Sequence, residues 1–364
     1  MEPRNVDHLL RRRNQSETQG AIDRRNFVKY AAGLIVGGSV SSLLTSCAAP
    51  AATPASATGS SGLMGNGEKY PYIYYLTSIS YWDMHLKGME DACKLLNVTF
   101  DKAGPAGADV EAEVTAIEQA ISEKVPGLIV AAIVDDVIAK PINQAIDAGI
   151  PVVTCDASSD TSKQLCYVGT PNEEAGYLSA KRLIEMMGGQ GKIILTTTTV
   201  AAPAKAMREI GFRRAVTETN GAVEIVAKVD DGDRAEVAVQ SVGQAIQANP
   251  DANGIFTISA GAGLGTIKAL QEAGRDDIKA GAFANDQAAY KLTKERPGTF
   301  IAAQDGYKMG FMSILLVHLA AKGLIVPRYG FKELGLSPLP PFVSSDILFI
   351  DADNADQYIG CEAC

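Results

Sequence analysis

Apolar segments of strand length alternate with amphipathic segments of helix length along most of this 364-residue chain, and this alternation constrains the fold more than any single motif. A continuous apolar run such as 127–134 (GLIVAAIV) is typical of a parallel strand that is covered on both faces. The pattern therefore predicts an α/β protein with two Rossmann-like lobes built on parallel sheets. The expected strands are 72–77, 98–101, 127–132, 151–155, 166–169, 192–198, 223–228, 254–257, 280–283 and 300–303. The expected helices are 81–96, 110–124, 137–148, 172–187, 205–219, 233–248, 263–273 and 306–322.

The first 46 residues read as an export signal. Arg24 and Arg25 resemble the pair of a twin-arginine signal, and the sequence Leu-Thr-Ser before Cys47 resembles a lipoprotein cleavage site. The alternative is a retained membrane anchor, but residues 31–46 offer only about 16 uncharged residues where a spanning helix needs roughly 20. We expect export, cleavage and acylation at Cys47, with the protein held on the outer face of the cytoplasmic membrane, in the periplasm or at the cell surface.

Residues 47–69 form a segment of small residues that we expect to act as a flexible tether. Between 48 and 67 the chain has no charged and no aromatic side chain, so little of it can be buried. As a random coil of this length, its ends would lie about 25 Å apart on average.

The acidic balance of the chain argues against several partners. Residues 1–46 contain seven Lys or Arg and four Asp or Glu, so the remainder has 26 basic and 38 acidic residues and a net charge of −12. Nucleic acid and anionic lipid surfaces both require clustered Lys and Arg, which the sequence lacks. We expect a monomer whose partner is a small molecule.

Cysteines and histidines offer little for catalysis or metal binding. Cys93 and Cys155 fall within apolar patterns and are expected to be buried small hydrophobes, while the pairing of Cys155 and Cys166 stays open. Cys361 and Cys364 have CxxC spacing, but two ligands without a nearby histidine favour an inert or disulfide-closed tail over metal or redox chemistry. With no zinc-protease motif, no nucleophile elbow and no paired carboxylates, we expect no enzyme activity, no cofactor and no metal.

Several motifs together indicate a known family. The segment Ala148–Asp156 (AGIPVVTCD) closely matches part of the type I periplasmic sugar-binding proteins, of which the ribose-binding protein is the best-known member. Further segments match the family in the same order along the chain, at 88–92 and 117–121 before this segment and at 168–176, 208–212 and 249–256 after it. The resemblance extends over roughly residues 70–350.

The resemblance implies a division of the chain into two lobes joined by three crossings. The crossings would fall near Thr170, near Gln304 and Asp305, and near 343–345. The first lobe would comprise 70–169 and 306–343, and the second 170–305 and 344–352, followed by a tail at 353–364. The ligand would lie between the lobes, at the carboxyl ends of the strands.

On the first lobe, the resemblance points to Asp156, Tyr81, Trp82 and Asp83. Asp156 ends a strand where the family's aspartate accepts hydrogen bonds from sugar hydroxyls, although an acid there can also cap a turn. Tyr81 and Trp82 match the position where aromatic rings stack on a sugar. They could instead pack in the core, and Asp83 could simply favour the helix dipole.

On the second lobe, the resemblance points to Arg208, Ser259 and Gln304. Gln304 matches a hinge-side polar contact, since an amide both donates and accepts hydrogen bonds. Arg208 could bind ligand or brace the lobe. Ser259 takes a position usually filled by an amide, before a glycine-rich segment at 261–265 that most simply serves a tight helix entry.

The chain departs from the family at two places in the site. The family's aspartate after Gly-Phe is Ala284 here, so Asn285 or Asp286 would have to substitute for it, and a polar residue after the third strand is replaced by Ala131 and Ala132. Fewer hydrogen-bonding groups discriminate hydroxyl patterns less sharply.

The resemblance implies a substrate-binding lipoprotein. It would capture a small polar ligand, a monosaccharide or related polyol, by hinged lobe closure and deliver it to the permease of an ABC importer. The alternative is a sensory protein that presents a sugar-like signal to a chemoreceptor or kinase.

Overall fold

The computed structural model describes residues 62–360 apart from 79, 108, 199–202 and 326–338. The predictions for Arg24, Arg25, Cys47, Cys361 and Cys364 lie outside these described residues. Within the described part of the chain, no helix is both long and apolar enough to cross a membrane.

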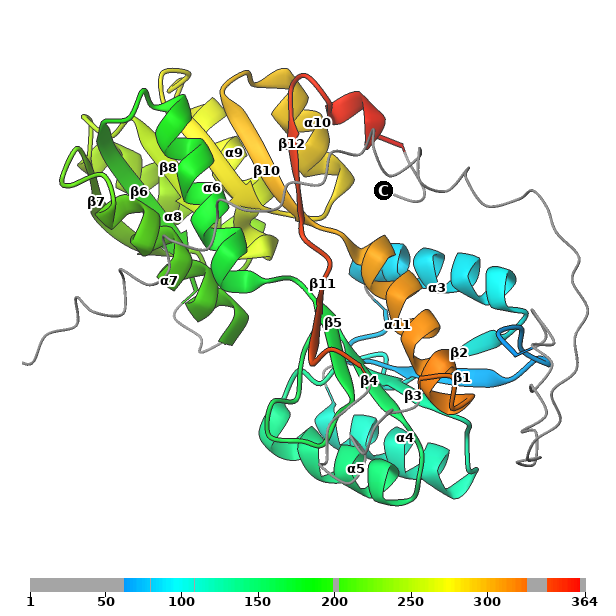
Figure 1. The fold of residues 1–364 in the computed structure, drawn as a ribbon. Helices are drawn as coiled ribbons and strands as arrows, with labels where there is room; N and C mark the ends of the chain where they lie inside the picture. The colour runs from blue at the N-terminus through cyan, green and yellow to red at the C-terminus, as the bar shows by residue number, and fades with distance from the viewer. Residues whose placement is uncertain (1–61, 79, 108, 199–202, 326–338, 361–364) are drawn as a thin grey trace, which may run out of the picture. The chain divides into compact units, whose positions relative to one another are not determined.

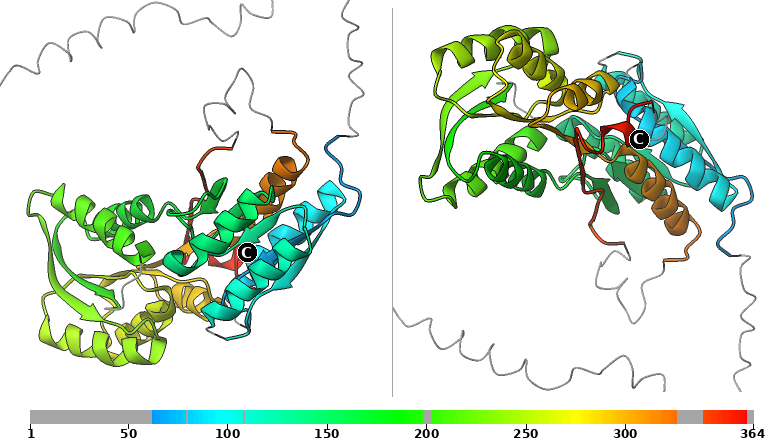
Figure 2. Two further views of the ribbon diagram at one scale, coloured as in Figure 1. Left: turned by 90° about the horizontal axis from the view of Figure 1, so that it is seen from below. Right: turned by 90° about the horizontal axis from the view of Figure 1, so that it is seen from above.

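The first lobe contains a six-stranded sheet in which all pairings are parallel (Figure 1). Its strands, in spatial order, are β11 (Phe342–Ser344), β5 (Cys166–Gly169), β4 (Val152–Cys155), β3 (Leu128–Val130), β1 (Lys69–Ile73) and β2 (Thr99–Ala103). Its helices are α3 (Asp83–Leu96), α4 (Val110–Ser122), α5 (Asp135–Asp147) and α11 (Gly306–Ala321). The helices α3 and α11 contact each other, as do α4 and α5, and the two pairs cover the two faces of the sheet (Figure 2).

The second lobe repeats this plan with one antiparallel edge. Its six strands are β12 (Ile347–Asp351), β10 (Thr299–Gln304), β9 (Lys279–Phe283), β8 (Gly254–Thr257), β6 (Gly191–Thr197) and β7 (Val223–Asp230), and only β12 runs antiparallel to its neighbour. Its helices are α6 (Asn172–Met186), α7 (Pro203–Thr217), α8 (Ala235–Ala248), α9 (Gly263–Glu272) and α10 (Gln287–Glu295). The expected α/β fold with two mostly parallel sheets is confirmed.

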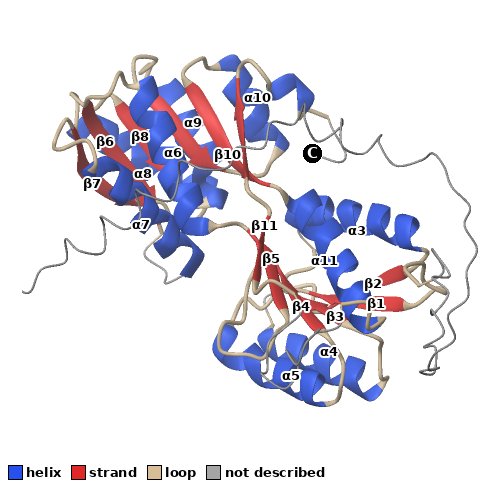
Figure 3. Ribbon diagram, viewed as in Figure 1, coloured by secondary structure: helices blue, strands red, loops and turns tan. Residues whose placement is uncertain are grey.

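Three segments connect the two sheets (Figure 3). The chain passes from the first sheet to the second between β5 and α6, returns between β10 and α11, and passes over again between β11 and β12. Each of these segments directly follows the carboxyl end of a strand, β5, β10 or β11, that is paired in parallel with a neighbour. Such ends are where α/β proteins place their ligands.

Two helix pairs pack so closely that glycine is required at the contact. A Cβ atom on Gly88 of α3 would lie 2.0 Å from the backbone oxygen of Tyr307, and one on Gly310 of α11 would lie 1.9 Å from that of His85. In the second lobe, a Cβ on Gly211 would lie 1.8 Å from the backbone oxygen of Glu173. These contacts fix the helices that carry Tyr81 and Arg208 against their neighbours.

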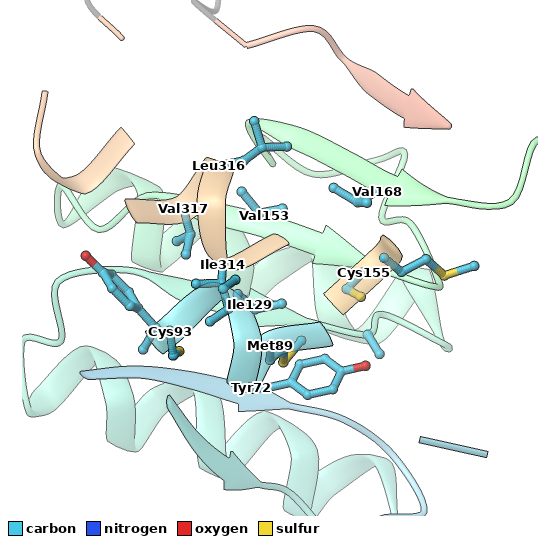
Figure 4. Close-up of a cluster of buried hydrophobic side chains, with 14 of the residues drawn as sticks. Tyr72, Met89, Cys93, Ile129, Val153, Cys155, Val168, Ile314, Leu316 and Val317 are labelled. Atoms are coloured by element: carbon cyan, nitrogen blue, oxygen red, sulfur yellow. The ribbon is translucent and has the colours of Figure 1, made fainter. Parts of the chain in front are cut away.

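The core of the first lobe forms between its sheet and the α3–α11 pair (Figure 4). Met89 of α3 and Ile314 of α11 face the strand residues Ile129 and Val153. Cys155 is fully buried and Cys93 is 6% exposed, and both are free thiols, as is Cys166. The prediction that Cys93 and Cys155 are buried small hydrophobes is confirmed.

Several elements differ from the expected ones. The first strand covers Lys69–Ile73, whereas the sequence pattern placed it at 72–77. The short strand β11 and the short helix α10 were not expected. The first helix opens with a 3-10 turn, Ser80–Trp82, before α3 proper.

The end of the expected tether is attached to the first lobe. The backbone N–H of Gly65 donates to the carbonyl of Leu96 at 2.7 Å, and the Nε2 of His318 lies 2.8 Å from the carbonyl oxygen of Leu63. Glu68 pairs with Lys322, which lowers the pKa of its carboxyl to about 2. We name residues 63–68 the docked segment; within it, the structure corrects the expectation of a free linker.

Candidate functional site

The hydroxyl of Tyr81 joins residues of both lobes. It donates a hydrogen bond to Oδ1 of Asp156 at 2.5 Å, and it accepts one from Nε2 of Gln304 at 2.6 Å. Tyr81 belongs to the turn before α3, Asp156 directly follows β4, and Gln304 ends β10. Three residues that were predicted from separate motifs are thus brought together.

Asp156 is held by its backbone as well as by its side chain. Its φ of 69° lies in the left-handed region, which aspartate tolerates better than most residues. The N–H of Asp156 donates to the carbonyl oxygen of Val168 at 2.9 Å, and the carbonyl oxygen of Asp156 accepts a hydrogen bond from the hydroxyl of Tyr167 at 2.9 Å. These bonds fix the carboxylate at the carboxyl end of the first sheet.

Arg208 extends the cluster within the second lobe. It is 5% exposed, its Nε donates to Oδ1 of Asn172 at 2.8 Å, and its Nη2 donates to Oε1 of Gln304. Its guanidinium lies 4.1 Å from the ring centroid of Phe283, which is a cation–π contact. Burial lowers the pKa of Arg208, while the acidic groups of Tyr81 and Asp156 act in the opposite direction.

These contacts form a continuous chain of hydrogen bonds that we call the relay. It is made up of Asp156, Tyr81, Gln304, Arg208 and Asn172. Burial, followed by the charge of Asp156, raises the pKa of Tyr81 well above its ordinary value, so the phenol stays protonated and donates.

Two polar atoms of relay residues keep hydrogen-bonding capacity. Among the described residues, no group hydrogen-bonds Oδ2 of Asp156 or Nη1 of Arg208. Thr170, 3% exposed at the first crossing between the lobes, has a buried hydroxyl without a partner. A carboxylate acceptor, a guanidinium donor and a hydroxyl are suited to bind a polyhydroxylated ligand.

The structure places Trp82 in the core of the first lobe. Its ring is 2% exposed, lies 5.0 Å from that of Tyr74, and donates from Nε1 to the carbonyl of Leu76 at 3.3 Å. The ring at the site is that of Tyr81, half-buried and 4.9 Å from Trp82. Asp83 is exposed as the first residue of α3, where its charge favours the helix N-terminus.

The three remaining predicted residues bond within the second lobe. Ser259 is fully buried and its Oγ accepts from the N–H of Thr198 at 3.0 Å. Asn285 brackets Gln304, donating to its carbonyl at 2.9 Å and accepting from its N–H at 3.0 Å. Asp286 caps α10 by accepting from the N–H of Ala289 at 2.8 Å. Neither Asn285 nor Asp286 joins the relay through its side chain in place of the missing aspartate at Ala284.

The sequence did not point to His85, Tyr167 or Asn172 as site residues, and His85 was expected to be an ordinary surface or packing histidine. His85 is fully buried, neither of its ring nitrogens has a hydrogen-bond partner among the described residues, and its Nε2 lies 3.8 Å from Oδ1 of Asp156. Its position one turn into α3, after the aromatic pair, was the available signal. Among the described residues, no group of three or more His, Cys, Asp or Glu could hold a metal ion.

Comparison with known proteins agrees with this architecture. Residues 70–324 match the model of the periplasmic binding protein domain. The chain belongs to this family. The type I sugar-binding group that the sequence resembles is thereby confirmed as its group.

Individual relatives are distant in sequence but close in fold. The xylose/arabinose-binding protein XylF of Sulfolobus acidocaldarius is 25% identical over 69% of this chain and 65% of its own length. A sugar-binding protein of a sugar ABC transporter from Bacillus halodurans is 29% identical, with a TM-score of 0.76 over 80% of this chain and all of that one. The arabinose-binding protein AraP of Geobacillus stearothermophilus is 29% identical, with a TM-score of 0.74 over 80% of this chain and 99% of that one. The matched part spans 65%, 63% and 55% of the first three curated relatives' lengths.

Proposed function

We propose that this protein is an extracytoplasmic solute-binding protein that captures a monosaccharide or related polyol and delivers it to an ABC importer. The relay is the observation that carries this proposal. It gathers a carboxylate, a phenol, an amide and a guanidinium where the two lobes of a periplasmic binding protein meet. Similar proteins that bind xylose or arabinose support a sugar as the ligand class.

Binding would work by closure of the lobes 70–169 with 306–343 and 170–305 with 344–352. Only a ligand that contacts both lobes binds the closed state better than the open one. Oδ2 of Asp156 belongs to the first lobe and Nη1 of Arg208 to the second. A sugar that bridges these two atoms satisfies this condition.

The direct test is calorimetric titration of the purified full chain with pentoses, hexoses, polyols and nucleosides. We expect saturable binding within one class, in the micromolar range or tighter, which corresponds to about −8 kcal/mol or more favourable. Binding of none of these compounds would refute the sugar proposal. Binding of nucleosides alone would move the ligand to another class.

Transport and sensing are separated by a second experiment. A strain that lacks the protein should lose uptake of the labelled ligand. If uptake persists while ligand-induced transcription disappears, the sensory alternative replaces the importer role. In both roles we propose that the protein acts by binding and not by catalysis.

We also propose export through the twin-arginine signal and acylation at Cys47. Cys47→Ala should release the protein from the membrane fraction, because a stable attachment requires the lipid chains. Replacing both Arg24 and Arg25 by lysine should retain the precursor in the cytoplasm. Membrane retention of the Cys47→Ala protein would instead support an uncleaved anchor.

A further inference from the structure

The hydroxyl of Tyr81 is bonded in the way that a sugar hydroxyl would be bonded. It donates to one carboxylate oxygen and accepts from one amide N–H, at 2.5 and 2.6 Å, with partners on both lobes. A sugar hydroxyl in such a site commonly makes the same pair of bonds, since each hydroxyl can donate once and accept. The phenol therefore occupies a complete hydroxyl-binding position.

The partners of the phenol are themselves fixed by other contacts. Gln304 is bracketed at its backbone by Asn285, and its Oε1 is taken by Arg208. Asp156 is fixed by backbone bonds that involve Val168 and Tyr167. A ligand hydroxyl that competed for this position would have to displace Tyr81 and leave its buried phenol unpaired, which is costly.

The groups without partners lie on either side of the phenol in the relay. Oδ2 of Asp156 and Nη1 of Arg208 have no hydrogen-bond partner among the described residues, whereas Oδ1 of Asp156 and the two side-chain polar atoms of Gln304 already take part in one hydrogen bond each. The site thus recognises fewer ligand hydroxyls than the number of its polar residues suggests.

We propose that Tyr81 determines specificity by substituting for one ligand hydroxyl, so that the protein selects a sugar without a hydroxyl at this position, such as a deoxy sugar. This inference rests on the proposed sugar-binding function and narrows its ligand class. Tyr81→Phe removes only the phenol oxygen and leaves Oδ1 of Asp156 and Nε2 of Gln304 open to a ligand hydroxyl.

The test is calorimetric titration of the full chain with pairs of sugars that differ by one hydroxyl. Suitable pairs are D-ribose with 2-deoxy-D-ribose, D-glucose with 2-deoxy-D-glucose, and D-galactose with 6-deoxy-D-galactose. For one pair, we expect the wild type to prefer the deoxy sugar. Tyr81→Phe should shift the ratio of the two affinities at least tenfold toward the hydroxylated sugar.

Tyr72→Phe is the matched control. Tyr72 is fully buried in the same lobe, and its hydroxyl has no oxygen or nitrogen partner among the described residues. It should leave the affinity ratio unchanged. Thermal unfolding of each variant checks its fold.

The outcomes separate this inference from the proposed function. If the wild type binds no sugar, both fail. If it binds a sugar but prefers the hydroxylated member of every pair, or if Tyr81→Phe leaves the ratio unchanged, only the role of Tyr81 is wrong. A shift in Tyr81→Phe that is absent from Tyr72→Phe supports it.

Discussion

The two lobes contribute similar polar residues to the site but use them differently. On the second lobe, the side chains of Ser259, Asn285 and Asp286 form hydrogen bonds with the backbone of their own lobe. On the first lobe, the side chains of Tyr81 and Asp156 bond to each other and, through the phenol, to Gln304 across the lobes. The second lobe therefore uses these three residues as a rigid support, whereas the first lobe directs the side chains of Tyr81 and Asp156 into the site.

The largest effect that we expect concerns a buried polar group of the first lobe that lies outside the site. It tests whether every such group without a partner contributes to ligand binding. Glu113 on α4 is fully buried, neither of its carboxyl oxygens has a hydrogen-bond partner in the described part of the chain, and burial raises its pKa from 4.5 to about 8. The folded state then binds more protons than the unfolded state between these two values, so stability falls as the pH rises through this window. Between pH 5 and pH 8, the free energy of unfolding should fall by up to about 3 kcal/mol from this group alone.

Urea unfolding at both pH values measures this change. Glu113→Gln should remove most of the fall, and Glu111→Gln, an exposed residue of the same helix, should not. An equal fall in all three proteins would assign the pH dependence to other groups. Glu113→Gln should leave ligand affinity unchanged, and this result would show that Glu113 does not contribute to ligand binding.

The next largest effect tests the first lobe's side of the comparison directly. Asp156→Ala removes the carboxylate that both holds Tyr81 and offers a free oxygen to ligand. Loss of a charge-assisted hydrogen bond should weaken ligand binding about 100-fold, or roughly 2.7 kcal/mol. Asp160→Ala, an exposed residue of the same loop, should bind as the wild type does. Unchanged affinity of Asp156→Ala in calorimetry would place the ligand elsewhere.

The smallest effect tests the rigid side. Asn285→Ala removes two hydrogen bonds to the backbone of Gln304, at 2.9 and 3.0 Å. We expect it to lower the free energy of unfolding by about 1–2 kcal/mol and affinity only a few fold. Asp286→Ser, which keeps a capping oxygen for α10, should change stability by less than this. If Asn285→Ala lowered affinity as much as Asp156→Ala while stability held, the division between the lobes would be wrong.

The sequence was sufficient for the architecture because the apolar period reports directly on strands and helices. The family resemblance also pointed to four residues that the structure joins in the relay, Asp156, Tyr81, Gln304 and Arg208. The sequence could not decide between Tyr81 and Trp82, because adjacent residues in a helical turn point in different directions and only packing shows which ring is buried. Nor could it show that Asn285 bonds to the backbone of Gln304, since the two residues meet only when β9 and β10 pair.

The composition of the docked segment was misleading for a related reason. Residues 48–67 contain no charged and no aromatic side chain, so the pattern predicted a linker. The docked segment is held by backbone hydrogen bonds, which do not depend on side-chain type, and by the contacts of His318 and of the Glu68–Lys322 pair. A short segment of this kind leaves no signal in hydropathy.

The docked segment also determines the point at which a membrane anchor would be attached to the folded protein. It is bonded to the end of α3, at Leu96, and to the last turn of α11, at His318 and Lys322, so tension would reach the first lobe near the amino end of β1. That end of a parallel strand is opposite to the end that carries the relay. From an anchor at Cys47, the chain up to Leu63 has a contour of at most roughly 55 Å. An anchor attached in this way would restrain the first lobe alone and leave the second lobe free to move, so that anchoring would not hinder closure of the two lobes.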